Sequence, residues 1–179
     1  LNGDGVDDIF VGSPGYNSGA GRFQILDGSD ADDSDGLTIL ATVDGVAGQS
    51  LGCSFAAMGQ MGDTVGGATQ NRLEFAVGAC EDDTTDTDAG AVIVYSYDDD
   101  SLSVVTTLVG ETAGDYFGSS IAKLNDLDGD TVPELIVGAY NYNGLRGRVY
   151  VYDGAGIVAD GQLLHGDVTI NPITGNAAD

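Results

Sequence analysis

The chain has 179 residues, of which 29 are acidic and 5 basic, and its formal net charge is −24. A charge this negative repels nucleic acid and anionic membrane surfaces and favours cations as partners. The sequence lacks the apolar run of about 18 residues that a membrane span needs, and its 42% of hydrophobic residues argues against disorder. The length suits one ordinary domain.

Short strands separated by Gly, Asp and Asn turns are predicted from the start of the chain. An acidic turn at 2–5 is followed by strand-like runs at 9–14, 21–26 and 37–43. The order then recurs twice. The second copy has runs at 48–54, 73–80, 90–95 and 102–109, and the third has runs at 114–124, 134–140, 147–152 and, weakly, 162–165.

Each copy therefore supplies about four β-rich runs, and no helical period is sustained. Four antiparallel strands repeated every ~60 residues are typical of a β-propeller blade. Two short motifs recur at fixed places in the copies. One is Phe117-Gly118, with Leu51-Gly52 in the second copy; the other is Gly12-Ser13-Pro14, Gly78-Ala79-Cys80 and Gly138-Ala139-Tyr140.

These motifs, which flank an Asp-rich loop, resemble FG-GAP repeats, the blades of the integrin α-subunit propeller and of many bacterial and algal surface proteins. The resemblance covers nearly the whole chain. It implies an all-β, propeller-type array of about three four-stranded blades. We expect the later part of a first blade at 1–43, a second blade at 44–109, a third at 110–160, and the opening of another blade at 161–179.

The two ends of the chain complement each other. The acidic loop of the third copy begins with an Asp that the first copy lacks, and Asp179 placed before Leu1 restores it. The blade split between the two ends could close within one chain, between neighbouring chains, or along a tandem array. A coincidence in an Asp-rich chain is the remaining interpretation.

The acidic loops are predicted cation sites. Alternating carboxylates with glycine between them place oxygen ligands on the inside of a tight loop, as Ca²⁺ requires. FG-GAP repeats bind Ca²⁺ at this loop, which implies two ligand sets. The third copy offers Asp126, Asp128, Asp130, the Val132 carbonyl and Glu134, where Glu replaces the usual Asp; the first offers Asn2, Asp4, the Val6 carbonyl, Asp8 and Asp179. A plain Asp-Gly turn is the alternative.

The second copy departs from this pattern. Gly66, Ala68 and Gln70 stand where carboxylates are needed, so we expect no cation there. The acidic stretches 81–88 and 30–35 are interpreted as solvated loops.

Cys53 and Cys80 belong to consecutive strands of the second copy. Antiparallel pairing would bring the start of one strand beside the end of the next, so a disulfide is geometrically plausible. Two buried free thiols are the alternative. A disulfide would indicate an oxidising, extracellular setting, where Ca²⁺ is abundant.

No catalytic motif is recognisable, and His165 is isolated in the sequence, so we expect no enzyme. The favoured hypothesis is an extracellular, Ca²⁺-stabilised structural protein that self-assembles with other copies through its complementary ends into a tandem or filament-like array. The integrin resemblance implies an alternative, an adhesion or recognition propeller that binds a protein or glycan. A propeller-type polysaccharide lyase or hydrolase is the third possibility.

Overall fold

The computed structural model describes residues 4–30, 36–61, 64–65, 68–69, 72–98 and 101–159. The first part of the chain contains β1 (Ile9–Gly12), α1 (Tyr16–Gly19), β2 (Arg22–Leu26), the 3₁₀ turn Gly28–Asp30 and β3 (Ile39–Asp44). The middle contains β4 (Leu51–Gly59), β5 (Thr64–Val65), β6 (Ala68–Thr69), β7 (Leu73–Ala79), β8 (Ala91–Asp98) and β9 (Ser101–Val109). The last part contains β10 (Phe117–Lys123), β11 (Leu135–Ala139), α2 (Tyr142–Leu145), β12 (Arg148–Tyr152) and α3 (Gly154–Ala159).

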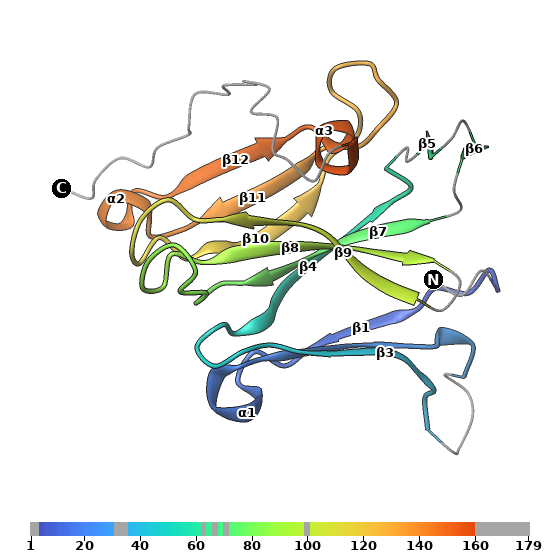
Figure 1. Ribbon diagram of the computed structural model, residues 1–179, viewed down its shortest axis with the longest axis horizontal. Coiled ribbons are helices and arrows are strands. Elements are labelled where there is room, and N and C mark those ends of the chain that lie inside the picture. The colour runs from blue at the N-terminus through green and yellow to red at the C-terminus, as the bar shows by residue number, and fades with distance from the viewer. Residues whose placement is uncertain are drawn as a thin grey trace.

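Three antiparallel sheets follow one another along the chain and fan out side by side (Figure 1). The first sheet has the order β1-β2-β3, the second β4-β7-β8-β9, and the third β10-β11-β12; β5 and β6 form a small separate hairpin. This confirms the all-β, propeller-type architecture. Among the described residues only the second sheet has four strands, and the weak strand expected at 162–165 lies outside them.

The second sheet is hydrophobic on both faces because it is covered on both sides. Nearly every residue of β7 and β8 is buried, which is the pattern of a sheet between two packing partners. One core, between the first and second sheets, contains Phe23, Ile25, Leu51, Phe75, Val77 and Tyr95. The other, between the second and third sheets, contains Ala76, Val92, Val94, Phe117, Leu135 and Val137.

The motif glycines lie where neighbouring sheets approach most closely. A Cβ on Gly12 would collide with the Gly52 carbonyl oxygen, and one on Gly78 with the Gly118 carbonyl oxygen. Isolated parallel bridges, Gly21 with Leu51 and Gly90 with Phe117, join successive sheets at their edges. Each Phe-Gly strand therefore packs against the Gly-Ala-Pro-like segment of the preceding sheet, where no side chain fits.

Short helical turns lie between or after strands, and they were not predicted from the sequence. α1 and α2 occupy equivalent places, between β1 and β2 and between β11 and β12. Each contains two residues with left-handed backbone, Asn17 and Ser18 in α1 and Asn143 and Gly144 in α2. Turns of four to six residues are too short to produce a helical period in the sequence.

Candidate cation site

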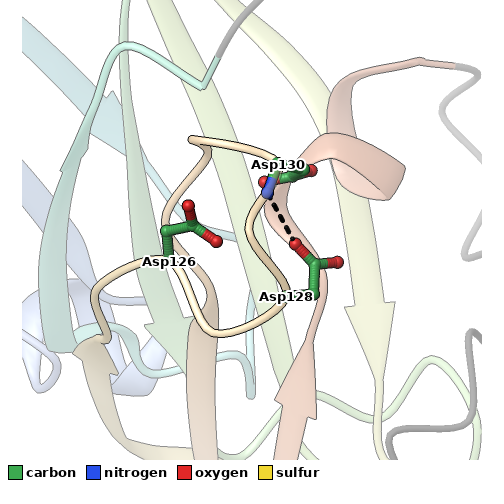
Figure 2. A group of neighbouring side chains, drawn as sticks. All are labelled: Asp126, Asp128 and Asp130. Atoms are coloured by element: carbon green, nitrogen blue, oxygen red, sulfur yellow. Dashed lines mark hydrogen bonds between the residues drawn. The ribbon is translucent and has the colours of Figure 1, made fainter.

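Three aspartates meet in the loop that connects β10 to β11. One carboxylate oxygen from each of Asp126, Asp128 and Asp130 lies within 4.8 Å of those of the other two, and all three residues are exposed (Figure 2). Within the described ranges this is the one group of at least three such residues close enough to hold an ion. The structure thus brings together the first three carboxylates of the predicted set.

Backbone amides inside the loop hold Asp126 in place. The N–H groups of Gly129 and Thr131 donate to its two carboxylate oxygens, over 2.6 and 2.8 Å. These hydrogen bonds favour the charged form and lower the pKa of Asp126, the bond from Gly129 having the largest effect. The loop therefore stabilises a carboxylate anion at its centre.

Asp128 and Asp130 also accept hydrogen bonds from backbone amides of the loop. The Asp130 N–H donates to Oδ1 of Asp128 over 3.1 Å, and the Val132 N–H donates to Oδ1 of Asp130 over 2.8 Å. Such turns, in which an Asp accepts from the amide two residues on, are common for this residue type. They fix the backbone of the loop in which one oxygen of each carboxylate lies within 4.8 Å of the others.

Glu134, the residue immediately before β11, contacts this loop. It is buried, and its Oε1 accepts a hydrogen bond from the Leu127 N–H over 2.8 Å. Its Oε2 is buried as well and has no hydrogen-bond partner. A buried carboxylate oxygen without a partner is costly, and a cation is the kind of group that would satisfy it.

The donor set suits a hard cation. Every side-chain ligand on offer is an oxygen, the geometry is that of a short flexible loop, and Ca²⁺ prefers about six to eight such oxygens. The fit rests on the Asp cluster, a group of mutually close oxygens that does not include Glu134. The orphaned oxygen of Glu134 is a separate observation, on the same loop, that points to a missing partner.

The first acidic loop is only partly described. The Val6 N–H donates to Oδ1 of Asp4 over 2.8 Å, and the Gly28 N–H donates to Oδ1 of Asp8 over 3.3 Å. The predicted ligands Asn2 and Asp179 lie outside the described residues, so this second cation site stays a prediction.

In the second copy, protein groups donate hydrogen bonds to Glu74, the one carboxylate that is kept at a predicted ligand position. Glu74, at the position equivalent to Glu134, is buried. The Met61 N–H donates to one of its oxygens over 2.9 Å, and the Ser96 hydroxyl donates to the other over 3.2 Å. A cation is not needed to balance its hydrogen bonding. Gly66 and Gln70 lie outside the described residues.

The two cysteines lie at the end of β7 and near the start of β4. A disulfide joins Cys53 to Cys80, whose Cα atoms are 6.3 Å apart, and the Cys80 N–H lies 3.2 Å from the Cys53 sulfur. Cys53 lies within the register shift between Leu51 and Phe55 of β4, so the bridge joins this irregular stretch to the end of the neighbouring β7.

One repeated arrangement was missed by sequence reasoning. Arg22 stacks on the Tyr16 ring at 3.8 Å, and Arg148 stacks on the Tyr142 ring at 4.3 Å. Each arginine also pairs with an acid, over 2.9 Å between Arg22 and Asp44 and between Arg148 and Glu111. The Arg22 guanidinium lowers the pKa of Asp44. A Tyr six residues before an Arg in both copies was the available signal.

Comparison with known proteins agrees with this geometry. The model of the FG-GAP repeat family matches residues 1–26 and 117–152. These two segments of the chain are similar to FG-GAP repeats. Integrin alpha-4 of Xenopus laevis is 32% identical over 90 residues, which are 49% of this chain and 8% of the relative. Integrin alpha-11 of Homo sapiens is 41% identical over 69 residues, 36% of this chain and 6% of the relative.

The chain therefore spans less than a tenth of the length of these curated relatives. The two matched FG-GAP segments contain Asp4 and Asp8 of the first acidic loop and the whole of the third. The second copy, which lacks the loop carboxylates and carries both cysteines, lies between the matched segments. In the part of the chain that the structure describes, no helix is long and apolar enough to cross a membrane.

Proposed function

We propose that this chain is a Ca²⁺-stabilised segment of an extracellular FG-GAP propeller, with a role in adhesion or recognition and no chemistry of its own. The observation that carries the cation assignment is the loop 126–134. It combines three clustered aspartates with a buried glutamate oxygen that has no partner.

The physical role of the cation would be to offset repulsion among carboxylates. The chain carries 29 acidic side chains against 5 basic ones. A divalent cation bound by Asp126, Asp128, Asp130 and the Val132 carbonyl, with Glu134 closing the far side, would pin the β10–β11 connection. Sites in extracellular modules bind Ca²⁺ with dissociation constants of ~10⁻⁴–10⁻³ M.

The test is thermal unfolding of the 179-residue protein in 2 mM EDTA and in CaCl₂ up to about 10 mM at constant ionic strength, a range that brackets such sites. We expect Ca²⁺ to raise the melting temperature, because binding to the folded state alone stabilises it. Asp128→Asn should remove most of this rise. Asp86→Asn removes the same charge from a loop outside the cluster and should leave the rise intact.

The result that would overturn the cation assignment is a melting temperature that Ca²⁺ leaves unchanged, or a rise that Asp128→Asn and Asp86→Asn reduce equally. The second pattern would indicate general screening of the negative charge rather than a site.

The adhesion or recognition role is supported by the similarity to two integrin alpha chains. The disulfide Cys53–Cys80 supports an extracellular setting, because disulfides persist in oxidising compartments. Surface plasmon resonance of the Ca²⁺-loaded protein against purified extracellular-matrix proteins tests this role, and binding to none of them would count against it.

A further inference from the structure

A cavity of about 420 Å³ lies between the first and second sheets. Its lining comes from β1, β2 and the residues just before β1 on one side, and from β4 and β7 on the other, in adjacent sheets of the fan (Figure 1). All ten residues that line it belong to the described parts of the chain. The volume is in the range of small-molecule sites, about 300–1,000 Å³.

Most of the lining is apolar, and much of it is aromatic. Phe10 and Phe55, one from each sheet, stack with their ring centroids 4.0 Å apart, and the Phe55 ring lies 5.7 Å from that of Phe75. Ile25 and Leu73 add aliphatic surface. Phe10 and Phe55 are only partly buried, although large apolar side chains gain most from full burial. A ligand with an apolar body would complete their burial.

The polar part of the lining is acidic. Asp7, Asp8 and Glu74 line the cavity, and none of the described residues around it is basic. Glu74 is buried, and each of its oxygens accepts one hydrogen bond, from the Met61 N–H or the Ser96 hydroxyl. A carboxylate oxygen can accept a second. The cavity therefore attracts positive charge, and the net charge of −24 strengthens that attraction.

The spacing of these acids favours an organic cation over a metal ion. Among the described residues, the loop 126–134 contains the one group of three acids whose oxygens all lie within 4.8 Å of one another, so the three acids of the cavity do not converge in this way. Ca²⁺ needs about six to eight oxygens close around it. A primary ammonium group has three N–H donors and needs fewer acceptors.

We propose that this cavity binds a small organic ammonium ion, a protonated primary amine attached to an aromatic body. The ammonium group binds at the acidic part of the lining, where Glu74 supplies a buried charge, and the aromatic body packs against Phe10 and Phe55. A cation close to a phenyl ring gains a further attraction from the ring's electrons. The ligand is additional to Ca²⁺, because Asp7 and Glu74 belong to neither predicted Ca²⁺ ligand set.

The experiment is saturation-transfer NMR of the full 179-residue protein at a fixed Ca²⁺ concentration of about 2 mM, with three probes. Phenethylammonium carries ring and charge, phenethyl alcohol carries the ring without the charge, and ethylammonium carries the charge without the ring. We expect phenethylammonium to bind with a dissociation constant on the order of 0.1–1 mM, as suits a ligand of its size. Each partial probe should bind about tenfold more weakly, because it lacks one of the two interactions.

Variants of the acidic lining test where the charge is recognised. Asp7→Asn should weaken phenethylammonium binding about threefold, because Asp7 is exposed. Glu74→Gln should weaken it about tenfold, because the charge of Glu74 is buried. Asp86→Asn removes the same charge from a residue that does not line the cavity and should leave the affinity unchanged.

A variant of the apolar lining tests where the ring lies. Ala57 lines the cavity from β4 and is exposed, so Ala57→Leu reduces the space without disturbing the core. This variant should weaken the binding of phenethylammonium and of phenethyl alcohol alike.

The absence of saturation transfer to any probe overturns the proposal. Equal binding of phenethylammonium and phenethyl alcohol also overturns it, because the cavity would then recognise the apolar body alone. Equal weakening by Asp7→Asn and Asp86→Asn would indicate attraction of cations by the net charge instead of a site. Circular dichroism of each variant separates loss of binding from loss of the fold. The outcome is independent of the Ca²⁺ test, because the cavity includes no residue of the loop 126–134.

Discussion

Glu134 and Glu74 occupy equivalent positions in two repeats and are satisfied by different partners. Glu74 accepts hydrogen bonds at both oxygens from Met61 and Ser96, whereas Glu134 keeps one buried oxygen without a partner. The identical side chain thus closes a hydrogen-bonded network in one repeat and is suited to a cation in the other. The difference comes from the surrounding loop, not from the glutamate.

Tyr95 gives a prediction for alkaline pH. Burial raises the pKa of its phenol to about 12, above the ordinary value of about 10. The neutral phenol is thus favoured in the folded state, and its contribution to stability is complete below about pH 10 and is lost as the pH rises toward 12. We expect the melting temperature to fall across this interval.

The measurement is thermal unfolding between about pH 9 and 12, the window set by that shift, with absorbance at 295 nm reporting tyrosinate. Tyr95→Phe should make the fall in melting temperature shallower. Tyr140→Phe, which removes a hydroxyl from an exposed ring, should not. Equal pH profiles for both variants would contradict the assignment.

Among the elements, the strands and loops that are signalled by neighbouring residues in the sequence were predictable. The expected strand at 102–109 is β9, Ser101–Val109, and the expected strand at 37–43 lies within one or two residues of β3. The loop 126–134 was also readable, because its candidate ligands lie within nine residues of one another. Such signals depend on neighbours in the sequence.

Features that depend on packing were not predicted. The stacking of Arg22 on Tyr16 needs the left-handed residues of α1 to bring the two side chains together. The hydrogen bond from the Met61 N–H to Glu74 was not predicted either, because Met61 belongs to another segment of the chain. α3 had one local signal, Asp153, whose side chain accepts from the Ala155 N–H over 2.9 Å at the start of the helix.

The disulfide between Cys53 and Cys80 is expected to stabilise the folded protein. It closes a separation of 27 residues between β4 and β7, and removing such a cross-link costs about 2–4 kcal/mol, mainly by freeing the unfolded chain. The double variant Cys53→Ala with Cys80→Ala should lose this amount in urea unfolding.

Dithiothreitol should lower the stability of the native protein toward that of the double variant and leave the variant unchanged. A native protein that is indifferent to dithiothreitol, with thiols that titrate freely, would show that the cysteines are not bridged.

For the whole molecule, the three sheets contribute unequally to the core. Among the residues that the structure describes, the second sheet is the one with a neighbouring sheet on both sides, and its β7 and β8 are almost continuously buried. Each outer sheet packs on the second sheet by one face. The first sheet does so through Phe23 and Ile25, and the third through Leu135 and Val137. Packing energy is therefore concentrated at the centre of the chain.

We expect the number of neighbouring sheets to set the order in which the sheets unfold locally. Repeated units that touch only their neighbours gain stability from each shared contact, so a unit with two neighbours outlasts units with one. In deuterated water, the amides of β7 and β8 should exchange last, and those of β1 and β12 orders of magnitude sooner. Mass spectrometry of peptides from each strand would show this gradient, and uniform exchange along the chain would mean that the three sheets unfold as one.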